Sequence, residues 1–307
     1  MSLRRYLYLR ALARERHFGR AAAACHVSQP TLSNAIRQLE ADLGVPIVER
    51  GQTFQGFTPE GLTVLDHARR ILALQEALEQ DLAQRQGGLM APLRLGAIPT
   101  ALPVVAHLVE AFSARHPAAP VRVLSLSSRA IERGLAAFEL DAAITYLENE
   151  PLADVRMVPL YSERYHLLGR RAVLGEAVVG RGQATWAEAA AHPLCLLTPD
   201  MQNRRIVDAA FRMADRSVAP ALETNSVINL LTNARLGPYA SVVPGPLLTV
   251  LPADESVVAL PLVAPDVAQV VGLVHPDRDP APPVARALAR AVAEAGVPRA
   301  IARALAA

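Results

Sequence analysis

A run of short polar side chains opens a helical pattern near the N-terminus. Residues 23–40 read AACHVSQPTLSNAIRQLE, with Ser28 where a helix N-cap is expected and Pro30 in the first turn. The polar residues that follow have the lengths and hydrogen-bonding groups that suit base edges and phosphates. They are Gln29, Thr31, Ser33, Asn34 and Arg37. The pattern predicts a helix that contacts DNA, and a solvated polar face is the alternative.

A second set of polar side chains falls where predicted strands give way to helices in the C-terminal half. Ligands of open α/β sheets bind at such strand ends, and helix N-termini there attract anions. We therefore expect a small ligand, and most readily a small anion, in a cleft at these ends, although each hydroxyl alone could be a plain N-cap. The expected ligand-contacting residues are Thr100, Ala101, Ser127, Ser128, Tyr146, Thr198, Met201, Gln202, Asn203 and Ser226.

The sequence offers little for catalysis or metal binding. Cys25 and Cys195 form no CxxC pair, and although Cys25 adjoins His26, no second ligand pair stands at a metal-binding spacing. We expect two buried structural thiols, no metal and no cofactor. The G-x-S-x-G, Walker and G-x-G-x-x-G patterns are absent as well. An enzyme is therefore disfavoured, and it stays an alternative together with an architectural DNA-binding protein that does not respond to ligands.

The polar run near the N-terminus needs helices to position it. An apolar stripe predicts a first helix, residues 20–25 predict a short alanine-rich second helix, and another stripe predicts a third that ends at Gly44 and Pro46. Two helices joined by a short turn, with the polar start of the second one facing outward, form a helix-turn-helix. The first stripe is Leu3, Leu7, Leu9, Leu12 and Ala13, and the other is Leu32, Ile36, Leu39 and Leu43.

A wing and a long helix are expected next. Residues 45–61, VPIVERGQTFQGFTPEG, predict a short hairpin that would bring Arg50 and Gln52 to DNA, and Thr58 then caps a helix that runs to about Gln86. The apolar stripe of this helix is too narrow for a globular core and suits pairing with its copy in a second subunit. The stripe consists of Leu65, Ala68, Ile71, Leu72, Ala77, Leu78 and Leu82.

Beyond Gly87-Gly88, short apolar strands alternate with alanine-rich helices. This alternation predicts parallel sheets with helical crossovers, arranged as two α/β lobes. The first set is strands 93–99, 121–127 and 141–145 with helices 101–115 and 129–138. The second set follows residues 160–168 and is strands 193–198 and 239–245 with helices 204–214 and 226–236. Strands 257–263 and 269–276 are expected to return the chain to the first lobe.

Charge and hydropathy limit the classes of protein to which this sequence can belong. Residues 1–70 carry ten arginines and six acidic residues, a balance of +4, whereas the whole chain sums to +2. A basic N-terminal segment of this kind indicates a nucleic-acid partner. No apolar run approaches the roughly 20 residues that span a bilayer, and the N-terminus lacks a secretory pattern. We expect a cytoplasmic protein with no membrane partner.

The segment FGRAAAACHVSQPTLSNAIRQLEADLGVPIVER, followed by FTPEG, closely resembles the winged helix-turn-helix of LysR-type transcriptional regulators. The resemblance implies an α/β chain with a winged helix-turn-helix (1–58), a dimerising linker helix (59–88) and a two-lobed effector domain (89–307). That domain would have the type 2 periplasmic-binding-protein fold, with lobe I at 89–161 and 266–307 and lobe II at 162–265. The implied partners are double-stranded operator DNA, a small effector and further copies of the chain, as a dimer of dimers.

Some individual positions match the pattern of the family, and others depart from it. Thr100 and Ser128 match the effector-contacting hydroxyls of the family. Asn34, Gln52 and Gln55 stand where the family usually has basic residues, so we expect fewer phosphate contacts and a shallower salt dependence. The stretches CLLTPDMQNRRIVD and LETNSV resemble a LysR subgroup associated with formate dehydrogenase gene clusters, which makes formate, a small carboxylate, a candidate effector.

Overall fold

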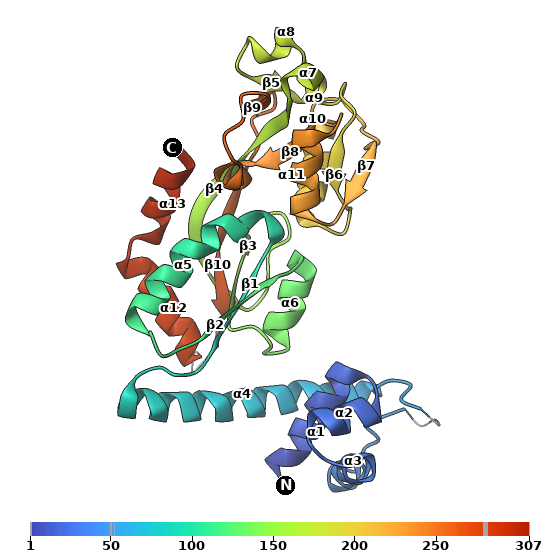
Figure 1. The fold of residues 1–307 in the computed structure, drawn as a ribbon. Helices are drawn as coiled ribbons and strands as arrows, with labels where there is room; N and C mark the ends of the chain where they lie inside the picture. The colour runs from blue at the N-terminus through green and yellow to red at the C-terminus, as the bar shows by residue number, and fades with distance from the viewer. Residues whose placement is uncertain (1, 50, 52, 279–281, 307) are drawn as a thin grey trace. The chain divides into compact units, whose positions relative to one another are not determined.

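The computed structural model describes residues 2–49, 51, 53–278 and 282–306, apart from the side chains of residues 83–87. The chain forms two compact units, residues 1–88 and residues 89–307, whose elements are labelled in Figure 1. Within the described ranges, no helix combines the length and the apolar character needed to cross a membrane.

Four helices make up the N-terminal unit. They are α1 (Leu3–Glu15), α2 (Phe18–Ala24), α3 (Gln29–Leu43) and α4 (Pro59–Gly87). Local signals explain their ends: the Ser28 hydroxyl accepts the Thr31 N–H at 3.3 Å at the start of α3, and Gly44 ends that helix at a φ of 71°. The predicted helix-turn-helix is therefore confirmed, with helix ends within a few residues of those expected.

The core of the N-terminal unit differs in part from the predicted stripes. Leu9, Leu12, Leu32, Ile36 and Leu39 are buried, as expected. Three leucines of the same stripes, Leu3, Leu7 and Leu43, are exposed instead, whereas the rings of Tyr6 and Tyr8 are buried. Helix α1 contacts α2, α3 and α4, so its buried surface is wider than the single stripe and includes the tyrosine side.

The wing is held by hydrogen bonds to α3 and by two backbone bonds between its own arms. The Glu49 N–H donates to the Gly56 carbonyl at 3.1 Å, and the Thr58 N–H donates to the Ile47 carbonyl at 3.0 Å. Val48 and Phe57 form one isolated antiparallel bridge, so the strand expected at residues 45–48 is not formed. The Glu40 carboxylate accepts the N–H groups of Ile47 at 2.7 Å and Val48 at 3.1 Å. Because these N–H groups bond to a side chain, they are not available to a strand ladder.

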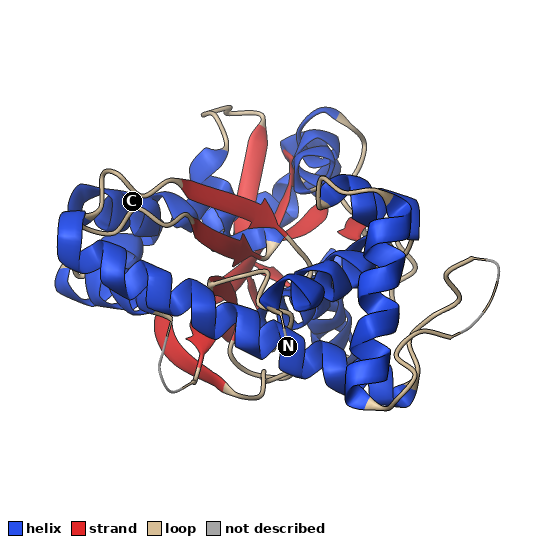
Figure 2. Ribbon diagram, turned by 90° about the horizontal axis from the view of Figure 1, so that it is seen from below, coloured by secondary structure: helices blue, strands red, loops and turns tan. Residues whose placement is uncertain are grey.

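Helix α4 uses its apolar stripe in two ways along one uninterrupted helix (Figures 1 and 2). Leu65, Ala68 and Leu72 are buried in the core of the N-terminal unit itself, which corrects the expectation that they face a second subunit. Further along, Leu78 and Leu82 are 59% and 52% exposed. This second part of the stripe, together with Ile71, which is also exposed, is available for pairing with a copy of the helix.

Lobe I of the C-terminal unit is a sheet with helices on it. Its strands are β1 (Leu93–Ala97), β2 (Val121–Ser125), β3 (Ala142–Tyr146) and β10 (Ala268–Pro276). Its helical elements are η1 (Pro99–Ala101), α5 (Leu102–Arg115), α6 (Ser128–Ala136), α12 (Pro283–Glu294) and α13 (Val297–Ala306). Strand β1 pairs in parallel with β2 and β3, and β10 pairs antiparallel with β3. The parallel part follows the predicted strand–helix alternation.

Lobe II is built from shorter elements. Its strands are β5 (Ala184–Thr185), β6 (Cys195–Leu197), β7 (Leu222–Thr224), β8 (Ser241–Pro244) and β9 (Val257–Val263). Its helical elements are α7 (Arg171–Leu174), α8 (Glu176–Val179), α9 (Trp186–Ala189), α10 (Gln202–Met213), α11 (Val227–Leu236) and η2 (Gly245–Val250). Strand β7 and helices α7–α9, together with α12 and α13 of lobe I, had no counterpart in the prediction.

Strand β4 (Val155–Arg170) runs through both lobes, as Figure 1 shows. Its first part pairs with β10 in lobe I, and residues 165–170 pair with β8 and β9 in lobe II. The expectation that residues 257–263 return to lobe I was therefore wrong, because β9 pairs with the lobe II part of β4 and with β5. The return is made by β10 alone.

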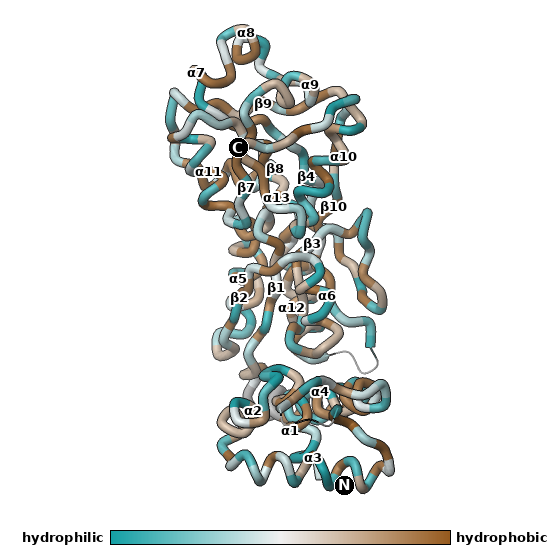
Figure 3. The backbone as a smooth tube through the Cα atoms, turned by 90° about the vertical axis from the view of Figure 1, so that its right-hand side faces the viewer, coloured by the Kyte–Doolittle hydropathy of each residue, from teal (hydrophilic) through white to brown (hydrophobic). Residues whose placement is uncertain are grey.

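The hydrophobic core of the C-terminal unit lies along these strands. Residues of β3 and the middle of β10, such as Ile144 and Leu273, are fully buried. Figure 3 shows hydrophobic and hydrophilic residues in close succession along most segments of the chain. The predicted fold class, a winged helix-turn-helix with a long helix followed by a two-lobed α/β domain, is confirmed.

Candidate functional site

The outward face of α3 carries the polar residues predicted to meet DNA. The expected side chains are exposed, except for Ser33, which is half-buried. The exposed ones are Ser28, Gln29, Pro30, Thr31, Asn34 and Arg37. Two other expected contacts, Arg50 and Gln52, lie outside the described residues.

Capping uses some of these polar groups and leaves others for a partner. The Ser28 hydroxyl caps α3 and also lies 2.8 Å from the Thr31 hydroxyl, so its first role is to start the helix. Within the described part of the chain, Arg37 forms no ion pair, and the side chains of Gln29 and Asn34 form no hydrogen bond within the protein. An exposed guanidinium and two exposed amides on one helix can therefore bond to an external partner.

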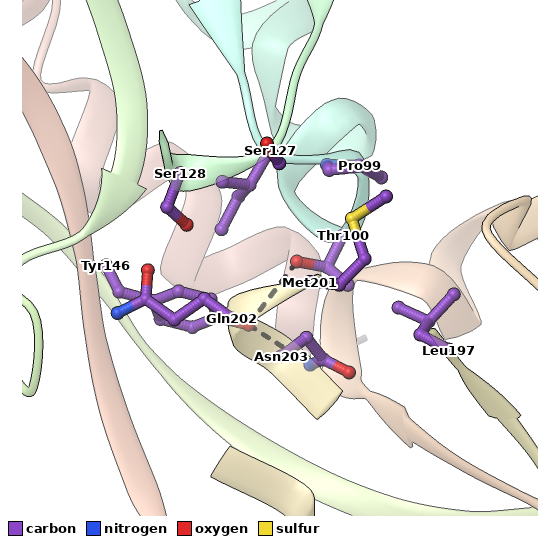
Figure 4. Close-up of a pocket in the computed structure, with 10 residues that line it drawn as sticks. Pro99, Thr100, Ser127, Ser128, Tyr146, Leu197, Met201, Gln202 and Asn203 are labelled. Carbon is purple, nitrogen blue, oxygen red and sulfur yellow. Dashed lines mark hydrogen bonds between the residues drawn. The ribbon is translucent and has the colours of Figure 1, made fainter. Parts of the chain in front are cut away.

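The C-terminal unit contains a small pocket between its two lobes (Figure 4). Lobe I contributes the ends of β1 and β3 and the start of α6, and lobe II contributes the end of β6 and the start of α10. The lining residues are Ile98, Pro99, Thr100, Ser127, Ser128, Tyr146, Leu197, Met201, Gln202 and Asn203. This places the pocket at the carboxyl ends of strands, where ligands of α/β sheets are expected.

Most of the predicted ligand-contacting residues line this pocket, and three do not. Ala101 is fully buried in the core of lobe I, and Ser226 caps α11 by accepting the Asn229 N–H. Thr198 follows β6 but is absent from the lining. These three positions follow strands or start helices, yet they do not line the pocket, which sequence spacing could not reveal.

Tyr146 is the centre of the polar wall of the pocket. Its hydroxyl lies 3.4 Å from Thr100 Oγ1 and accepts a hydrogen bond from Asn203 Nδ2 at 3.1 Å, as the dashed lines in Figure 4 show. Because Asn203 belongs to lobe II and Tyr146 to lobe I, this bond joins the two lobes. On its other side the Tyr146 hydroxyl donates to Glu163 Oε1 at 2.6 Å.

Hydrogen-bond donors face the pocket, and none of the described residues that line it carries a charged side chain. Met201 precedes the first turn of α10 and provides no side-chain cap. The N–H groups of this turn are therefore not bonded to a capping side chain and can bond to a ligand. Within the part of the chain that the structure describes, the buried hydroxyl of Ser128 has no hydrogen-bond partner. The space holds roughly one water-sized molecule, so a ligand of few non-hydrogen atoms is the kind that fits without rearrangement.

Four residues at or behind the pocket were not predicted. Ile98, Pro99 and Leu197 line it as apolar neighbours of predicted polar positions. Glu163 lies behind Tyr146 on β4 and is fully buried. The alternation of Tyr161, Glu163 and Tyr165 along a strand places the three side chains on one face, and this pattern was the available signal.

The thiols and potential metal ligands are not arranged as a reactive centre. Cys195 is buried, and burial raises the pKa of its thiol to about 11. Burial also raises the pKa of Cys25, which is half-buried rather than buried as expected. Across the described residues, no group of three or more histidine, cysteine or carboxylate side chains could hold a metal ion.

Comparison with protein families places both units. Residues 3–62 match the family described as bacterial regulatory helix-turn-helix protein, lysR family. Residues 86–296 match the family described as LysR substrate binding domain. The two matches together cover almost the whole chain.

Relatives and solved structures agree with these matches. The chain is 37% identical over 164 residues to the DNA-binding transcriptional dual regulator OxyR of Escherichia coli, and that match covers 53% of each chain. It is 39% identical over 166 residues to the hydrogen peroxide-inducible genes activator of Dickeya chrysanthemi, again over 53% of each. The match thus spans about half the length of these curated relatives. A full-length OxyR variant from Pseudomonas aeruginosa has a TM-score of 0.76 at 29% identity over 97% of both chains.

A second solved structure supports the fold alone. Full-length CbnR, solved in complex with its target DNA, has a TM-score of 0.63 at 22% identity and covers 96% of this chain and 100% of its own. The relatives are named as regulators rather than enzymes, which agrees with the lack of catalytic motifs in the sequence.

Proposed function

This chain belongs to the LysR family of transcriptional regulators, and we propose that it binds operator DNA through α3 and responds to a small ligand in the pocket between lobes I and II. The observation that carries the ligand role is the Tyr146–Asn203 hydrogen bond, which joins the two lobes at the pocket. A ligand beside this bond would contact both lobes, and it can shift the balance between lobe arrangements if it binds one arrangement better.

The exposed face of α3 supports the DNA-binding role. Ser28 and Pro30 shape the start of the helix, and we assign base-edge contacts to Gln29, Thr31, Ser33 and Asn34. Arg37, one turn further along, would contact a phosphate. Arg50 and Gln52 remain proposed wing contacts.

Subunit pairing is assigned to the second part of α4. Exposed leucines at the end of a long helix are stabilised when a copy of that helix covers them. We propose a dimer through this helix and a dimer of dimers as the full assembly, with residues 1–58 as the DNA-binding region, 59–88 as the linker and 89–307 as the effector region. Lobes I and II would then be 89–161 with 266–307, and 162–265.

A small carboxylate such as formate is the ligand we favour. The uncapped first turn of α10 and the unpaired Ser128 hydroxyl offer donors to an anion, and the small volume suits one carboxylate group. Thr100, Tyr146, Gln202 and Asn203 would orient it. No cation stands among the described residues that line the pocket, so these neutral donors must stabilise the charge.

Hydrogen peroxide is the second candidate, because the relatives are named as hydrogen peroxide-inducible genes activators. An intact peroxide molecule would fit the same small pocket. Sensing through a thiol is less well supported, because reactive cysteines need a lowered pKa and access to solvent. Both cysteines here have a raised pKa, and Cys195 is buried.

Operator binding with and without ligand tests the proposal. A binding sequence is first selected from random DNA, and its affinity is then measured with sodium formate or hydrogen peroxide present. Thr100→Val keeps the side-chain shape and removes the hydroxyl, so ligand affinity should fall about tenfold while ligand-free DNA binding stays nearly unchanged. Ser128→Ala is the matched second variant.

Three outcomes would contradict the proposal. Ligand affinities that are equal in the wild type, Thr100→Val and Ser128→Ala would place the sensor elsewhere. Operator binding that ignores every small ligand would favour an architectural role, and chemical turnover of a ligand would indicate an enzyme.

A further inference from the structure

Glu163 is a fully buried carboxylate directly behind the pocket, on the strand that runs through both lobes. Its Oε1 accepts hydrogen bonds from Tyr146 at 2.6 Å and from Tyr165 at 3.2 Å. Among the described residues, no hydrogen-bond partner meets its buried Oε2, although the Tyr161 hydroxyl acts on the carboxyl and lowers its pKa. Burying an ionised carboxylate with an unpaired oxygen costs free energy. Protonation of Glu163 would remove the buried charge and so lower this cost.

The surroundings of Glu163 contain hydroxyls but no compensating cation. The titratable groups that act on it are Tyr146 from β3 and Tyr161 and Tyr165 from its own strand. On the adjacent strand, β10, the neutral Gln269 stands opposite in register. The next cation along β4, Arg164, is exposed and paired with Asp266. Among the described residues, no ion pair reaches Glu163.

His166 completes the titratable groups near this part of β4. Burial lowers its pKa, and its Nδ1 is buried without a hydrogen-bond partner. It is therefore neutral near neutral pH and contributes no positive charge to Glu163.

When Glu163 is ionised, the hydroxyls behind the pocket donate their hydrogen bonds toward Glu163 and away from the pocket. The Tyr146 proton is committed to Glu163, so its oxygen can only accept from the other side. The Asn203 amide fills one of these acceptor positions, and a contact from Thr100 at 3.4 Å must then be a donation to Tyr146. The Thr100 oxygen that remains for a ligand is an acceptor, which disfavours an anion.

When Glu163 is protonated, the direction of this chain can reverse. The carboxylic O–H can donate to Tyr146, the Tyr146 O–H can turn toward Thr100, and the Thr100 O–H is released to donate into the pocket. The wall then presents a donor, and the buried negative charge behind it is gone. Both changes favour an anionic ligand.

We propose that Glu163, acting through Tyr146 as a positioning residue, sets whether the pocket wall donates or accepts hydrogen bonds, so that binding a small anion is coupled to uptake of one proton by Glu163. This inference rests on the proposed ligand role of the pocket. It selects among ligands by charge: a small anion binds with a proton, whereas a neutral hydrogen-bond donor such as peroxide favours the ionised state.

The direction of the pH effect follows from the buried carboxyl. Burial raises the pKa of Glu163 to about 7, against hydrogen bonds from its tyrosines that lower it. Below this pKa most of the protein has a protonated Glu163 and a pocket wall that donates hydrogen bonds. Above it, the fraction of protein with a protonated Glu163 falls about tenfold per pH unit. The affinity for an anion should fall in the same proportion.

Calorimetric titration with sodium formate at about pH 6, 7 and 8, in buffers with different heats of ionisation, tests the coupling. In the wild type, affinity should fall about tenfold per unit above pH 7, and binding there should take up close to one proton per site. Glu163→Gln cannot titrate but can still bond to the tyrosines, so its affinity should not depend on pH and its proton uptake should vanish. Glu150→Gln is the matched control and should keep the wild-type pH slope.

The unliganded protein gives an independent readout. The Glu163 carboxyl signal in carbon-13 NMR, assigned by its loss in Glu163→Gln, should titrate near neutral pH. In Tyr146→Phe the formate affinity should fall and its pH dependence should shrink, because the link from Glu163 to Thr100 is cut.

The contradicting results are distinct. Formate binding with the same affinity across this pH range, or an equal slope in Glu163→Gln, overturns the coupling and leaves the proposed ligand role intact. A Glu163 carboxyl that titrates in the ordinary acidic range also overturns it. A folded wild type that binds no formate at any of these pH values removes both the anion as ligand and the coupling.

Discussion

Arg205 and Glu150 form a bidentate ion pair that ties α10 of lobe II to the loop after β3 in lobe I. Arg205 Nε lies 2.7 Å from Oε1, and Nη2 lies 2.6 Å from Oε2. Helix α10 is also joined to the last residue of β3 by the Tyr146–Asn203 bond, and to the same loop by a 3.5 Å bond from Gln202 to the Glu148 carbonyl. Alternate residues at the end of β3 thus meet the start of α10 beside the pocket.

Loss of the Arg205–Glu150 pair should loosen the two lobes. Both side chains are partly exposed, so Glu150→Gln should cost only about 0.5–1 kcal/mol, near the upper range for exposed pairs because the geometry is bidentate. A small drop in thermal stability of the C-terminal unit and a few-fold weaker ligand affinity are the expected results. An unchanged affinity would show that this pair does not help to close the pocket.

The same pair predicts no pH effect near neutrality. The hydrogen bond from Arg205 lowers the pKa of Glu150, so its contribution is present above the ordinary glutamate pKa and is lost as pH falls through the lowered value. Between about pH 6 and 8 the contribution of the Arg205–Glu150 pair should stay constant, whereas the protonation of Glu163 changes in this range. Unfolding curves of the wild type and Glu150→Gln at several pH values measure the difference.

Gly61 should not tolerate a side chain. A Cβ at this position, in the first turn of α4, would overlap the carbonyl oxygen of Ile47 in the wing. Gly61→Ala should therefore destabilise the N-terminal unit by about 1–3 kcal/mol despite the better helix propensity of alanine. Thr63→Ala, at an exposed position of the same helix, is the control and should be nearly neutral. Equal unfolding midpoints for the two variants would contradict the close approach.

Replacement of polar groups on α3 should separate base recognition from phosphate binding. Gln29→Ala should cost about 1–3 kcal/mol at the selected operator and relax base preference. Arg37→Ala should weaken operator and random DNA more evenly and reduce the salt dependence. Anisotropy titrations on both DNAs, with Gln38→Ala as a control on the same helix, measure this. Unchanged operator affinity in Gln29→Ala and Arg37→Ala would remove α3 as the reading helix.

Replacing exposed leucines of α4 by charged residues should dissociate the proposed dimer. Burying a leucine side chain contributes about 1.5–3 kcal/mol, so Leu78→Glu with Leu82→Glu should raise the dimer dissociation constant at least about tenfold. Light scattering at micromolar concentration would then show a smaller mass. Glu79→Gln, between the two leucines in sequence, should leave the mass unchanged. A monomeric wild type would contradict the pairing itself.

Local signals in the sequence were enough for the helices of the N-terminal unit. Ser28, Pro30 and Gly44 act on backbone groups within a few residues, so the start and end of α3 follow from neighbours in the chain. The strands and helices that carry the pocket in lobe I were also predicted, because alternation of apolar runs is a local property. The family resemblance then supplied the order of the two units.

Non-local contacts decided the rest. Glu40 accepts the N–H groups of Ile47 and Val48, and the strand expected there is reduced to a single bridge. Leu72 is buried by helices α4 meets in its own unit, although its spacing suited a partner subunit.

The tertiary structure alone decided which residues share the pocket and what lies behind it. Spacing placed Thr100, Thr198 and Ser226 at equivalent strand ends, but only Thr100 lines the pocket, because side-chain direction depends on how each strand packs. Glu163 lies 17 residues after Tyr146 and meets it when β3 and β4 both pair with β10, which lies more distant in the sequence. Sequence determines which groups a chain can offer, whereas their hydrogen bonds and their pKa depend on strands that pair across large separations.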